Sequence, residues 1–221
     1  MALERVLEPE VMDTWDEASD YDSMDHSEVN RAFVTDFLAA GDVSGLFLDL
    51  GTGTALIPIE LCQRHEDCYV MAADASVNML DLARYNIEIA GQIERIQLDH
   101  ADAKELPYQD AYFLAVLSNS IIHHVPDPSV VLKEAIRVVS PGGLLFFRDL
   151  MRPESDETVR QLVETYTGQE NEHQQQMFEE SLRAALDLEE MRALVADLGF
   201  DPETVQATSD RHWTWTARKP A

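Results

Sequence analysis

Two glycines and an acidic residue mark the strongest candidate ligand site in the sequence. Residues 48–55 read Leu-Asp-Leu-Gly-Thr-Gly-Thr-Ala, directly after a short apolar run and before a helical pattern. Glycines at a strand-to-helix turn let a ligand approach the backbone where a side chain would collide. Because open α/β sheets bind ligands at the carboxyl ends of their strands, we expect this turn to line a binding site. A tight turn without a ligand is the competing interpretation.

The spacing around these glycines argues against two common nucleotide-binding motifs. A dinucleotide fingerprint needs a small residue three positions after Gly53, and the sequence has the bulky Leu56 there. A phosphate-binding P-loop needs Gly-Lys-Ser or Gly-Lys-Thr, which does not follow the turn. The sequence therefore disfavours a nicotinamide-dependent dehydrogenase and a P-loop nucleotide hydrolase.

Acidic residues follow the next two apolar runs. Asp74 ends the run at residues 69–73, where a carboxylate can accept hydrogen bonds from both hydroxyls of a ribose. Its other possible role, compatible with the first, is to cap the helix that follows. Residues 99–103, Asp-His-Ala-Asp-Ala, follow a weaker apolar run, and an acid there could accept a hydrogen bond from the exocyclic amine of an adenine ring.

Two histidines after the fourth apolar run are the candidate catalytic residues. Histidine side chains ordinarily titrate near neutral pH, so we expect His123 or His124 to take a proton from an acceptor hydroxyl or amine. A structural histidine that caps the loop is the alternative for both, and it weighs more for His124.

Arg148 and Asp149, at the end of the fifth run, are candidate substrate residues. Arg148 can hold a substrate carboxylate or phosphate, although pairing with a neighbouring acid is the favoured alternative in so acidic a chain. The other histidines show no ligand spacing, so we expect no metal site.

Alternating apolar runs and helical patterns predict the elements that position these residues. Five buried strands are expected, and helices are expected at residues 75–90 and 129–139, the second ending at Ser-Pro-Gly-Gly. This alternation predicts an α/β fold whose parallel sheet carries helices on both faces. Residues 204–208 and 213–217 look like an antiparallel hairpin at the end of the sheet. The five expected strands are residues 46–48, 69–73, 96–98, 112–117 and 144–147.

The length of 221 residues suits one domain, residues 1–221, with four parts. We expect an N-terminal cap or lid at 1–30, in which Trp15 and Tyr21 either cover the ligand or pack on the sheet edge. The cofactor-binding core spans 31–150, and a helical insertion at 151–185 is expected to cover the substrate. Residues 186–221 supply a C-terminal helix and the hairpin.

The charge balance excludes several classes of partner. The chain has 42 Asp and Glu against 16 Lys and Arg, a net charge of −26, and no basic stripe that would bind nucleic acid or anionic lipid. No secretory signal is evident, and the apolar run at 111–117 is too short to span a bilayer. We therefore expect a cytoplasmic protein, monomeric or homodimeric, with a small-molecule substrate and neither a nucleic-acid nor a membrane partner.

Over residues 47–150 the ordered motifs resemble the class I S-adenosylmethionine-dependent methyltransferases, in particular the small-molecule branch. The motifs are Leu-Asp-Leu-Gly-Thr-Gly at 48–53, Asp-Ala-Ser at 74–76, Asp-Ala at 102–103, His-His at 123–124 and Ser-Pro-Gly-Gly at 140–143. The resemblance implies a doubly wound, Rossmann-like sheet of seven strands, mostly parallel, with an antiparallel last strand. The third glycine of the family's loop is Ala55 here, a small enough replacement to keep binding.

The resemblance also implies a cofactor, S-adenosylmethionine, with S-adenosylhomocysteine as its product. The loop would hold the methionine part, Asp74 the ribose, and Asp102 with Ala103 the adenine; Ser118 and Asn119 would line the methionine end. Tyr21 would touch the carboxylate or sulfonium region. The full set of expected cofactor residues is Tyr21, Asp49, Gly51, Thr52, Gly53, Asp74, Ala75, Met79, Asp102, Ala103, Ser118 and Asn119.

The predicted function is therefore methyl transfer to a small-molecule acceptor by in-line displacement. The protein would mainly supply position and a water-poor site, because the cofactor already carries an activated leaving group. Two alternatives stay open: an S-adenosylmethionine-binding protein with other chemistry, and a non-catalytic protein that keeps the fold. Intact Gly51, Gly53 and Asp74 count against the second.

Overall fold

A computed structural model describes residues 3–8, 14–24, 27–41 and 44–221. The chain divides into two compact units, which are described in turn. The larger unit contains residues 11–119, 130–147 and 216–221, and the smaller contains residues 1–10, 120–129 and 148–215.

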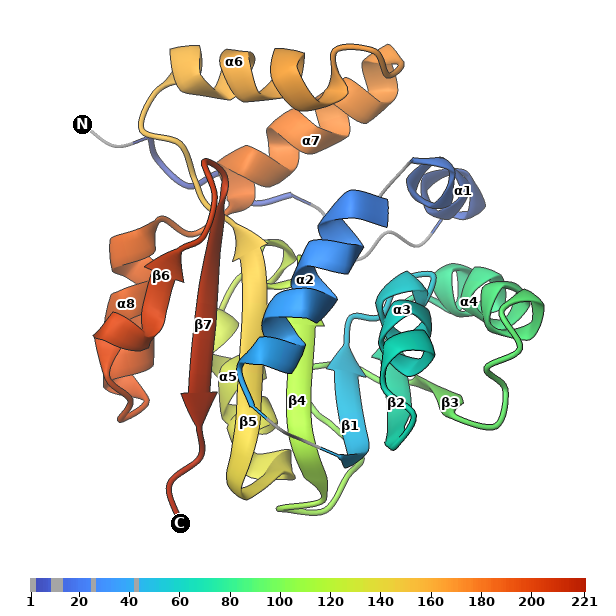
Figure 1. Cartoon of the computed structure of the whole chain (residues 1–221). Helices are drawn as coiled ribbons and strands as arrows, with labels where there is room; N and C mark the ends of the chain where they lie inside the picture. The colour runs from blue at the N-terminus through green and yellow to red at the C-terminus, as the bar shows by residue number, and fades with distance from the viewer. Residues whose placement is uncertain (1–2, 9–13, 25–26, 42–43) are drawn as a thin grey trace. The chain divides into compact units, whose positions relative to one another are not determined.

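The strands form one seven-stranded sheet in the order β3-β2-β1-β4-β5-β7-β6 (Figure 1). Strand β1 pairs in parallel with β2 and β4, β2 pairs in parallel with β3, and β6 pairs antiparallel with β7. The predicted mostly parallel sheet with a reversed last strand is confirmed, as is the terminal hairpin. The strands are β1 (Gly45–Leu50), β2 (Cys68–Asp74), β3 (Ile96–His100), β4 (Phe113–Asn119), β5 (Val139–Leu150), β6 (Val205–Ala207) and β7 (His212–Arg218).

The strand order makes the carboxyl ends of β1 and β4 the switch point of the sheet. After β1 the chain builds outward through β2 and β3, then returns to place β4 on the other side of β1. Loops that leave neighbouring strands in opposite directions open a crevice between them, and ligands of open α/β sheets bind there.

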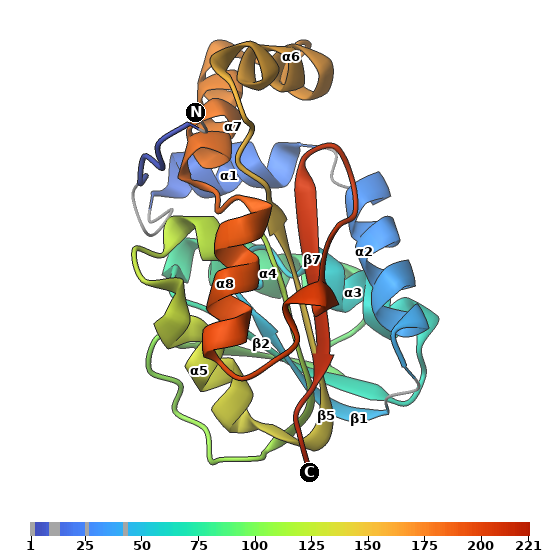
Figure 2. The same ribbon diagram turned by 90° about the vertical axis from the view of Figure 1, so that its left-hand side faces the viewer.

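Helices of the larger unit cover both faces of the sheet, as predicted. Helices α2 and α3 lie on one face and α5 on the other (Figure 2). Four aromatic rings pack edge to face under α2: Phe33 and Phe37 meet Phe146, and Phe37 also meets Phe47, with centroids 5.1–5.8 Å apart. The helices are α1 (Trp15–Ser23), α2 (Ser27–Ala39), α3 (Leu56–Arg64), α4 (Val77–Ile89) and α5 (Pro128–Val138).

Several predicted boundaries were wrong, each for a local reason. The helix predicted from residue 129 begins at Pro128, because Asp127 rather than Ser129 accepts the first free backbone N–H. The helix ends at Val138, before residues 140–143 as predicted, but the next strand begins at Val139 and not at 144. Gly142 and Gly143 belong to it because they exchange backbone hydrogen bonds with Lys219. The helix predicted at 75–90 spans only Val77–Ile89, since Ser76 caps it.

The smaller unit contains the predicted helical insertion as two helices, α6 (Asp156–Thr167) and α7 (Glu172–Ala184), which pack side by side (Figure 1). Leu150, Val159 and Leu182 form its apolar core, against which Leu3 and Phe178 pack. Helix α8 (Leu188–Asp197) matches the predicted C-terminal helix, and a capping box of Asp187 and Glu190 begins it.

The predicted division of the chain into cap, core, insertion and C-terminal part stays a prediction. Helix α2 runs through the expected boundary at residue 30, so the first part does not end in a linker there. In the ranges that the structure describes, no helix is both long enough and apolar enough to cross a membrane.

Candidate functional site

A cleft lies at the switch point of the sheet, within the larger unit. It holds about 330 Å³ of empty space, counted together with its open mouth. Strand β1 and the loop after it supply most of the polar lining, and β4 adds Asn119. The lining residues are Tyr21, Asn30, Asp49, Gly51, Thr52, Thr54, Leu56, Ile57 and Asn119.

The glycine loop curves around the cleft through left-handed backbone. Gly51 and Gly53 have φ values of 72° and 55°, which residues with a side chain rarely adopt. Backbone N–H groups of Gly51 and Thr52 both donate to the carbonyl of Ala73, at 2.9 and 3.0 Å, and so tie the loop to the end of β2. Ala55, at the third glycine position of the family, is also left-handed, with a φ of 62°.

Asp74 ends β2 and holds the same loop from its other side. Its Oδ2 accepts a hydrogen bond from the Gly53 N–H, and its Oδ1 accepts one from the Ser76 N–H, each 2.8 Å long. Burial raises the pKa of Asp74, and these bonds act in the opposite direction. The N-cap of α4 is Ser76, not Asp74. A carboxylate has about four acceptor positions, so Asp74 keeps capacity for ribose hydroxyls.

Asp49 and Tyr21 are the titratable residues in the lining of the cleft, and only Asp49 can give it negative charge near neutral pH. Asp49 is buried and its Oδ2 accepts a hydrogen bond from the Thr52 hydroxyl at 2.6 Å. Burial, with a contribution from the charge of Asp74, raises the pKa of Asp49 to about 7. Burial and the charges of Asp74 and Asp49 raise the pKa of Tyr21 to about 12. The cleft therefore favours a ligand that carries positive charge.

Two polar atoms of the lining are buried without a hydrogen-bond partner among the described residues. They are the hydroxyl oxygen of Thr54 and the side-chain oxygen of Asn119. Burying a polar group without a partner costs about 1–3 kcal/mol. A polar ligand in the cleft would supply the missing partners, so the lining fits the methionine end of S-adenosylmethionine.

Five of the residues expected to contact cofactor line the cleft: Tyr21, Asp49, Gly51, Thr52 and Asn119. Gly53 lies in the same loop and donates its backbone N–H to Asp74. Ser118 is buried and donates its hydroxyl to the carbonyl of Leu50 at 2.7 Å. Met79 is buried at the start of α4, and Ala75 is exposed.

The expected adenine contacts lie on the loop after β3. Asp102 is half exposed and faces Lys104, whose backbone N–H and ammonium approach its two oxygens at 2.9 and 3.3 Å. Ala103 is partly buried beside it. The contacts of Ala75, Met79, Asp102, Ala103 and Ser118 with a cofactor stay predictions.

Sequence reasoning missed four residues of the lining: Asn30, Thr54, Leu56 and Ile57. Thr54 and Leu56 lie within or beside the glycine motif, so proximity in the sequence could have found them. Asn30 comes from α2, and no motif marks it.

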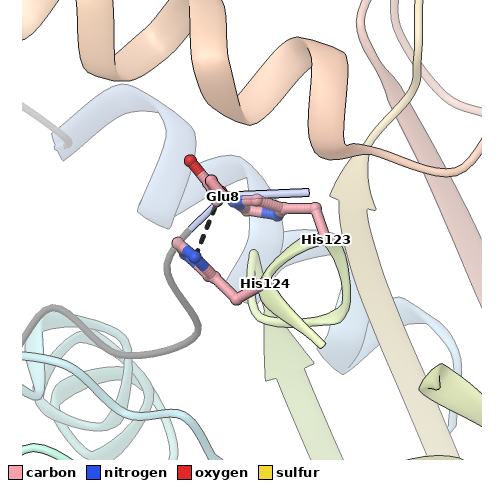
Figure 3. A group of neighbouring side chains, drawn as sticks. All are labelled: Glu8, His123 and His124. Atoms are coloured by element: carbon pink, nitrogen blue, oxygen red, sulfur yellow. Dashed lines mark ion pairs between the residues drawn. The ribbon is translucent and has the colours of Figure 1, made fainter. Parts of the chain in front are cut away.

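The two candidate catalytic histidines lie in the smaller unit, on a short 3-10 helix (Ile122–His124). Nδ1 of His123 is 2.5 Å from Oδ1 of Asp149, and Oδ2 of Asp149 accepts the backbone N–H of Ile122 at 2.6 Å. On the other side, Oε1 of Glu8 lies 3.3 Å from Nε2 of His123 and 3.1 Å from Nδ1 of His124 (Figure 3). Both ring nitrogens of His123 therefore face carboxylates.

Charge and burial oppose one another in this cluster. Burial lowers the pKa of His123. The charge and hydrogen bond of Asp149, together with the charge of Glu8, raise it by more than burial lowers it, so the pKa lies above its usual value. Burial raises the pKa of Asp149, and the opposite charge and hydrogen bond of His123 bring it below its usual value. His123 can take a proton from an acceptor only when Glu8 no longer faces Nε2. Its role as a base stays a prediction, as does that of His124.

The candidate substrate residues at the end of β5 are both buried. Arg148 donates from Nε to the hydroxyl of Thr214 at 2.8 Å, and Asp149 holds His123. Their contact with a substrate stays a prediction. Glu8 was not predicted at all, because nothing in the sequence around it carries a motif.

Comparison with known proteins points to one family. Residues 48–147 match the methyltransferase domain family. The chain is 29% identical over 188 residues to 27-O-demethylrifamycin SV methyltransferase of Amycolatopsis mediterranei, covering 82% of this chain and 63% of the relative. It is 27% identical over 168 residues to the ubiquinone/menaquinone biosynthesis C-methyltransferase UbiE of Vibrio cholerae, covering 71% and 64%. The chain thus spans less than two thirds of the length of these relatives.

A solved structure shares the fold over almost the whole chain. It is a putative S-adenosyl-L-methionine-dependent methyltransferase of Methanococcus maripaludis, with a TM-score of 0.76, 16% identity and 98% coverage of both chains. The sheet order, the glycine loop with Asp74 at the switch point and the match over residues 48–147 agree with one another. Residues 48–147 thus match a methyltransferase domain, and the chain resembles the class I S-adenosylmethionine-dependent methyltransferases in sequence motifs and in fold.

Proposed function

We propose that this protein transfers the methyl group of S-adenosylmethionine to a small-molecule acceptor by in-line displacement. The observation that carries the proposal is the acidic cleft at the switch point, where Asp49, the glycine loop and Asp74 meet. Bound there, S-adenosylmethionine would supply a methyl group carried on a positively charged sulfur. After the transfer, that sulfur would be the neutral thioether of S-adenosylhomocysteine.

Each part of the cleft has a role in holding that cofactor. Asp74 accepts hydrogen bonds from the ribose hydroxyls with the acceptor positions that Gly53 and Ser76 leave open. The left-handed loop gives the methionine part access to backbone that a side chain would block. Asn119 and Thr54 meet polar atoms of the methionine end. Asp49 and the face of Tyr21 attract the ammonium and sulfonium charges.

A small organic molecule is the acceptor that the observations favour. The net charge of −26 opposes binding to nucleic acid. One similar protein is named as a methyltransferase of 27-O-demethylrifamycin SV, and another as a C-methyltransferase of ubiquinone/menaquinone biosynthesis; both names point to small organic molecules. The protein's contribution to the rate is orientation of the acceptor and exclusion of water, for which correct positioning can supply about 7–11 kcal/mol.

Proton removal is the second contribution that we assign to the chain. His123 and His124 are the candidate proton acceptors, and Arg148 is the candidate group that holds an anionic part of the acceptor. His124 is the more accessible histidine, since its side chain is 16% exposed against 4% for His123.

Calorimetric titration with S-adenosylmethionine, S-adenosylhomocysteine and NAD tests the cofactor. We expect saturable binding of the two sulfur compounds at one site per chain and no binding of NAD. Binding of NAD would overturn the assignment of the glycine loop, and binding of none of the three would favour a non-catalytic protein that keeps the fold. Binding without methyl transfer to any acceptor in a panel of phenols, quinols and amines would favour other chemistry at the same site.

A further inference from the structure

The smaller unit brings two imidazoles and a carboxylate to one point, and none of these three residues is among those that line the cofactor cleft. Glu8, His123 and His124 each offer one ligand atom, and these atoms all lie within 4.8 Å of one another. Figure 3 shows the carboxylate of Glu8 and the two rings converging, with Glu8 arriving from the N-terminal segment.

The distances in this cluster suit a shared ion. Oε1 of Glu8 lies 3.3 Å from Nε2 of His123 and 3.1 Å from Nδ1 of His124. Ligands at about 2.0–2.2 Å from a tetrahedral ion are about 3.3–3.5 Å apart, close to both separations. Two ring nitrogens and one carboxylate oxygen form a ligand set that Zn²⁺ and related divalent transition metals accept.

Glu8 supplies an independent observation. Its side chain is 8% exposed, and its Oε1 is buried without a hydrogen bond of good geometry to any described residue. A buried carboxylate oxygen between two imidazoles needs a positive partner, because burying an uncompensated charge is costly. In the metal-free protein protonated His123, at 3.3 Å, can be that partner. A metal ion between the three groups would satisfy the same oxygen.

The surroundings hold the ligands in place. Asp149 binds Nδ1 of His123 and so turns Nε2 toward Glu8, the arrangement in which a carboxylate orients a metal-bound histidine. Arg5 fixes the segment that carries Glu8, since it donates to the carbonyls of Ala184, His123 and Val125 at 2.6, 3.2 and 3.0 Å. The three ligands therefore come from two segments that the smaller unit already fastens together.

We propose that Glu8, His123 and His124 bind one divalent transition-metal ion, with Asp149 positioning His123. Three protein ligands leave a coordination position for water or for an anionic oxygen of a ligand. Sequence spacing predicted no metal site, because Glu8 lies far from the histidines in the chain. While the ion is bound, His123 and His124 are ligands and do not act as bases.

The test uses untagged full-length protein that has been freed of metal with a chelator and dialysed. Calorimetry with Zn²⁺ gives the affinity and stoichiometry, and visible absorption with Co²⁺ reports the ligands. We expect one ion per chain and Co²⁺ bands of nitrogen and oxygen ligands without thiolate charge transfer, which separates this site from Cys62 and Cys68.

Glu8→Gln and His124→Gln are expected to weaken Zn²⁺ binding at least 100-fold, and Asp149→Asn about 10–100-fold. The matched control, His173→Gln, changes an exposed histidine of α7 in the same unit and should leave binding unchanged. Thermal unfolding of each metal-free variant checks that it folds, and Glu8→Gln removes charge with little change in shape.

Three outcomes would overturn the proposal: no stoichiometric binding to the wild type, binding that survives Glu8→Gln and His124→Gln, or binding lost in His173→Gln. The first would leave the cluster as an ion pair that anchors the N-terminal segment. Binding of S-adenosylmethionine to the metal-free protein is measured separately, so the cofactor proposal can fail or hold independently of this one.

Discussion

At the scale of single residues, Asp49 and Asp74 are two carboxylates that accept hydrogen bonds from the glycine loop and whose surroundings give them different properties. Asp74 accepts two backbone hydrogen bonds, which favour its charged form. Asp49 is more deeply buried, and burial raises its pKa to about 7 although the hydrogen bond from Thr52 acts in the opposite direction. Asp74 is therefore suited to permanent hydrogen bonding, and Asp49 changes charge in the neutral range.

Asp74→Ala should weaken binding of S-adenosylmethionine by about 1–3 kcal/mol, because it removes charge-assisted hydrogen bonds to the ribose. Calorimetric titration measures the change, and Asp81→Ala, at an exposed acid of α4, is the control. Unfolding of both variants is followed to confirm that they fold. Unchanged affinity in folded Asp74→Ala would refute the ribose assignment.

Asp49→Asn should stabilise the ligand-free protein at pH 8 and much less at pH 5. The pKa of Asp49 in the folded protein, about 7, lies above its ordinary value of 3.8, so folding favours the protonated carboxyl. The stability that the protonated form contributes to the wild type is fully present below about pH 4 and is lost as the pH rises through 7. One unit of pKa shift corresponds to about 1.4 kcal/mol, so Asp49→Asn should raise the free energy of unfolding at pH 8 by at most about 4 kcal/mol.

Urea unfolding at the two pH values measures this difference, with Asp81→Asn as the control. The same variant should bind S-adenosylmethionine more weakly at pH 8, since it lacks the negative charge that attracts the cation. An equal gain in stability at both pH values would contradict the raised pKa.

At the scale of elements, local patterns in the sequence predicted where the strands and helices lie. Several strand ends depend instead on pairing with residues far away in the chain. The apolar runs of β1, β2 and β4 were evident because parallel strands covered on both faces are apolar throughout. Gly142 and Gly143 follow the helix as its predicted stop, and they also extend β5 because Lys219, far along the chain, pairs with them. No local pattern reports that partner.

Phe37→Ala should lower the free energy of unfolding by about 3–5 kcal/mol, because it leaves a cavity among the rings that join α2 to the sheet. Denaturant unfolding measures the loss. Arg31→Lys, at an exposed residue of the same helix, is the control, with an expected change within about 0.5 kcal/mol. A loss below about 1 kcal/mol for Phe37→Ala would mean that α2 is not docked as described.

At the scale of the whole molecule, the excess of acidic residues opposes folding through self-repulsion. A net charge of −26 on 221 residues exceeds what local ion pairs can neutralise, since the chain has only 16 Lys and Arg. Added salt shortens the range of that repulsion from about 30 Å at 0.01 M to about 3 Å at 1 M.

The stability of the protein should therefore rise with NaCl concentration. Thermal unfolding from 0.01 to 1 M NaCl in the presence of a chelator, expressed as the shift in Tm, measures the effect, and KCl at equal concentrations is the control for ion-specific binding. A Tm that stays constant or falls over this range would show that charge repulsion does not limit stability.

The sequence by itself determined the order of the elements, the glycine loop with Asp74 and the acidic character of the surface, because each depends on residues close together in the chain or on composition. The tertiary structure alone decided which distant residues meet. Asn30 joins the cleft from α2, and Glu8 faces His123 and His124 from the N-terminal segment. Single residues carry no periodicity or spacing, so their partners follow only from how the chain packs.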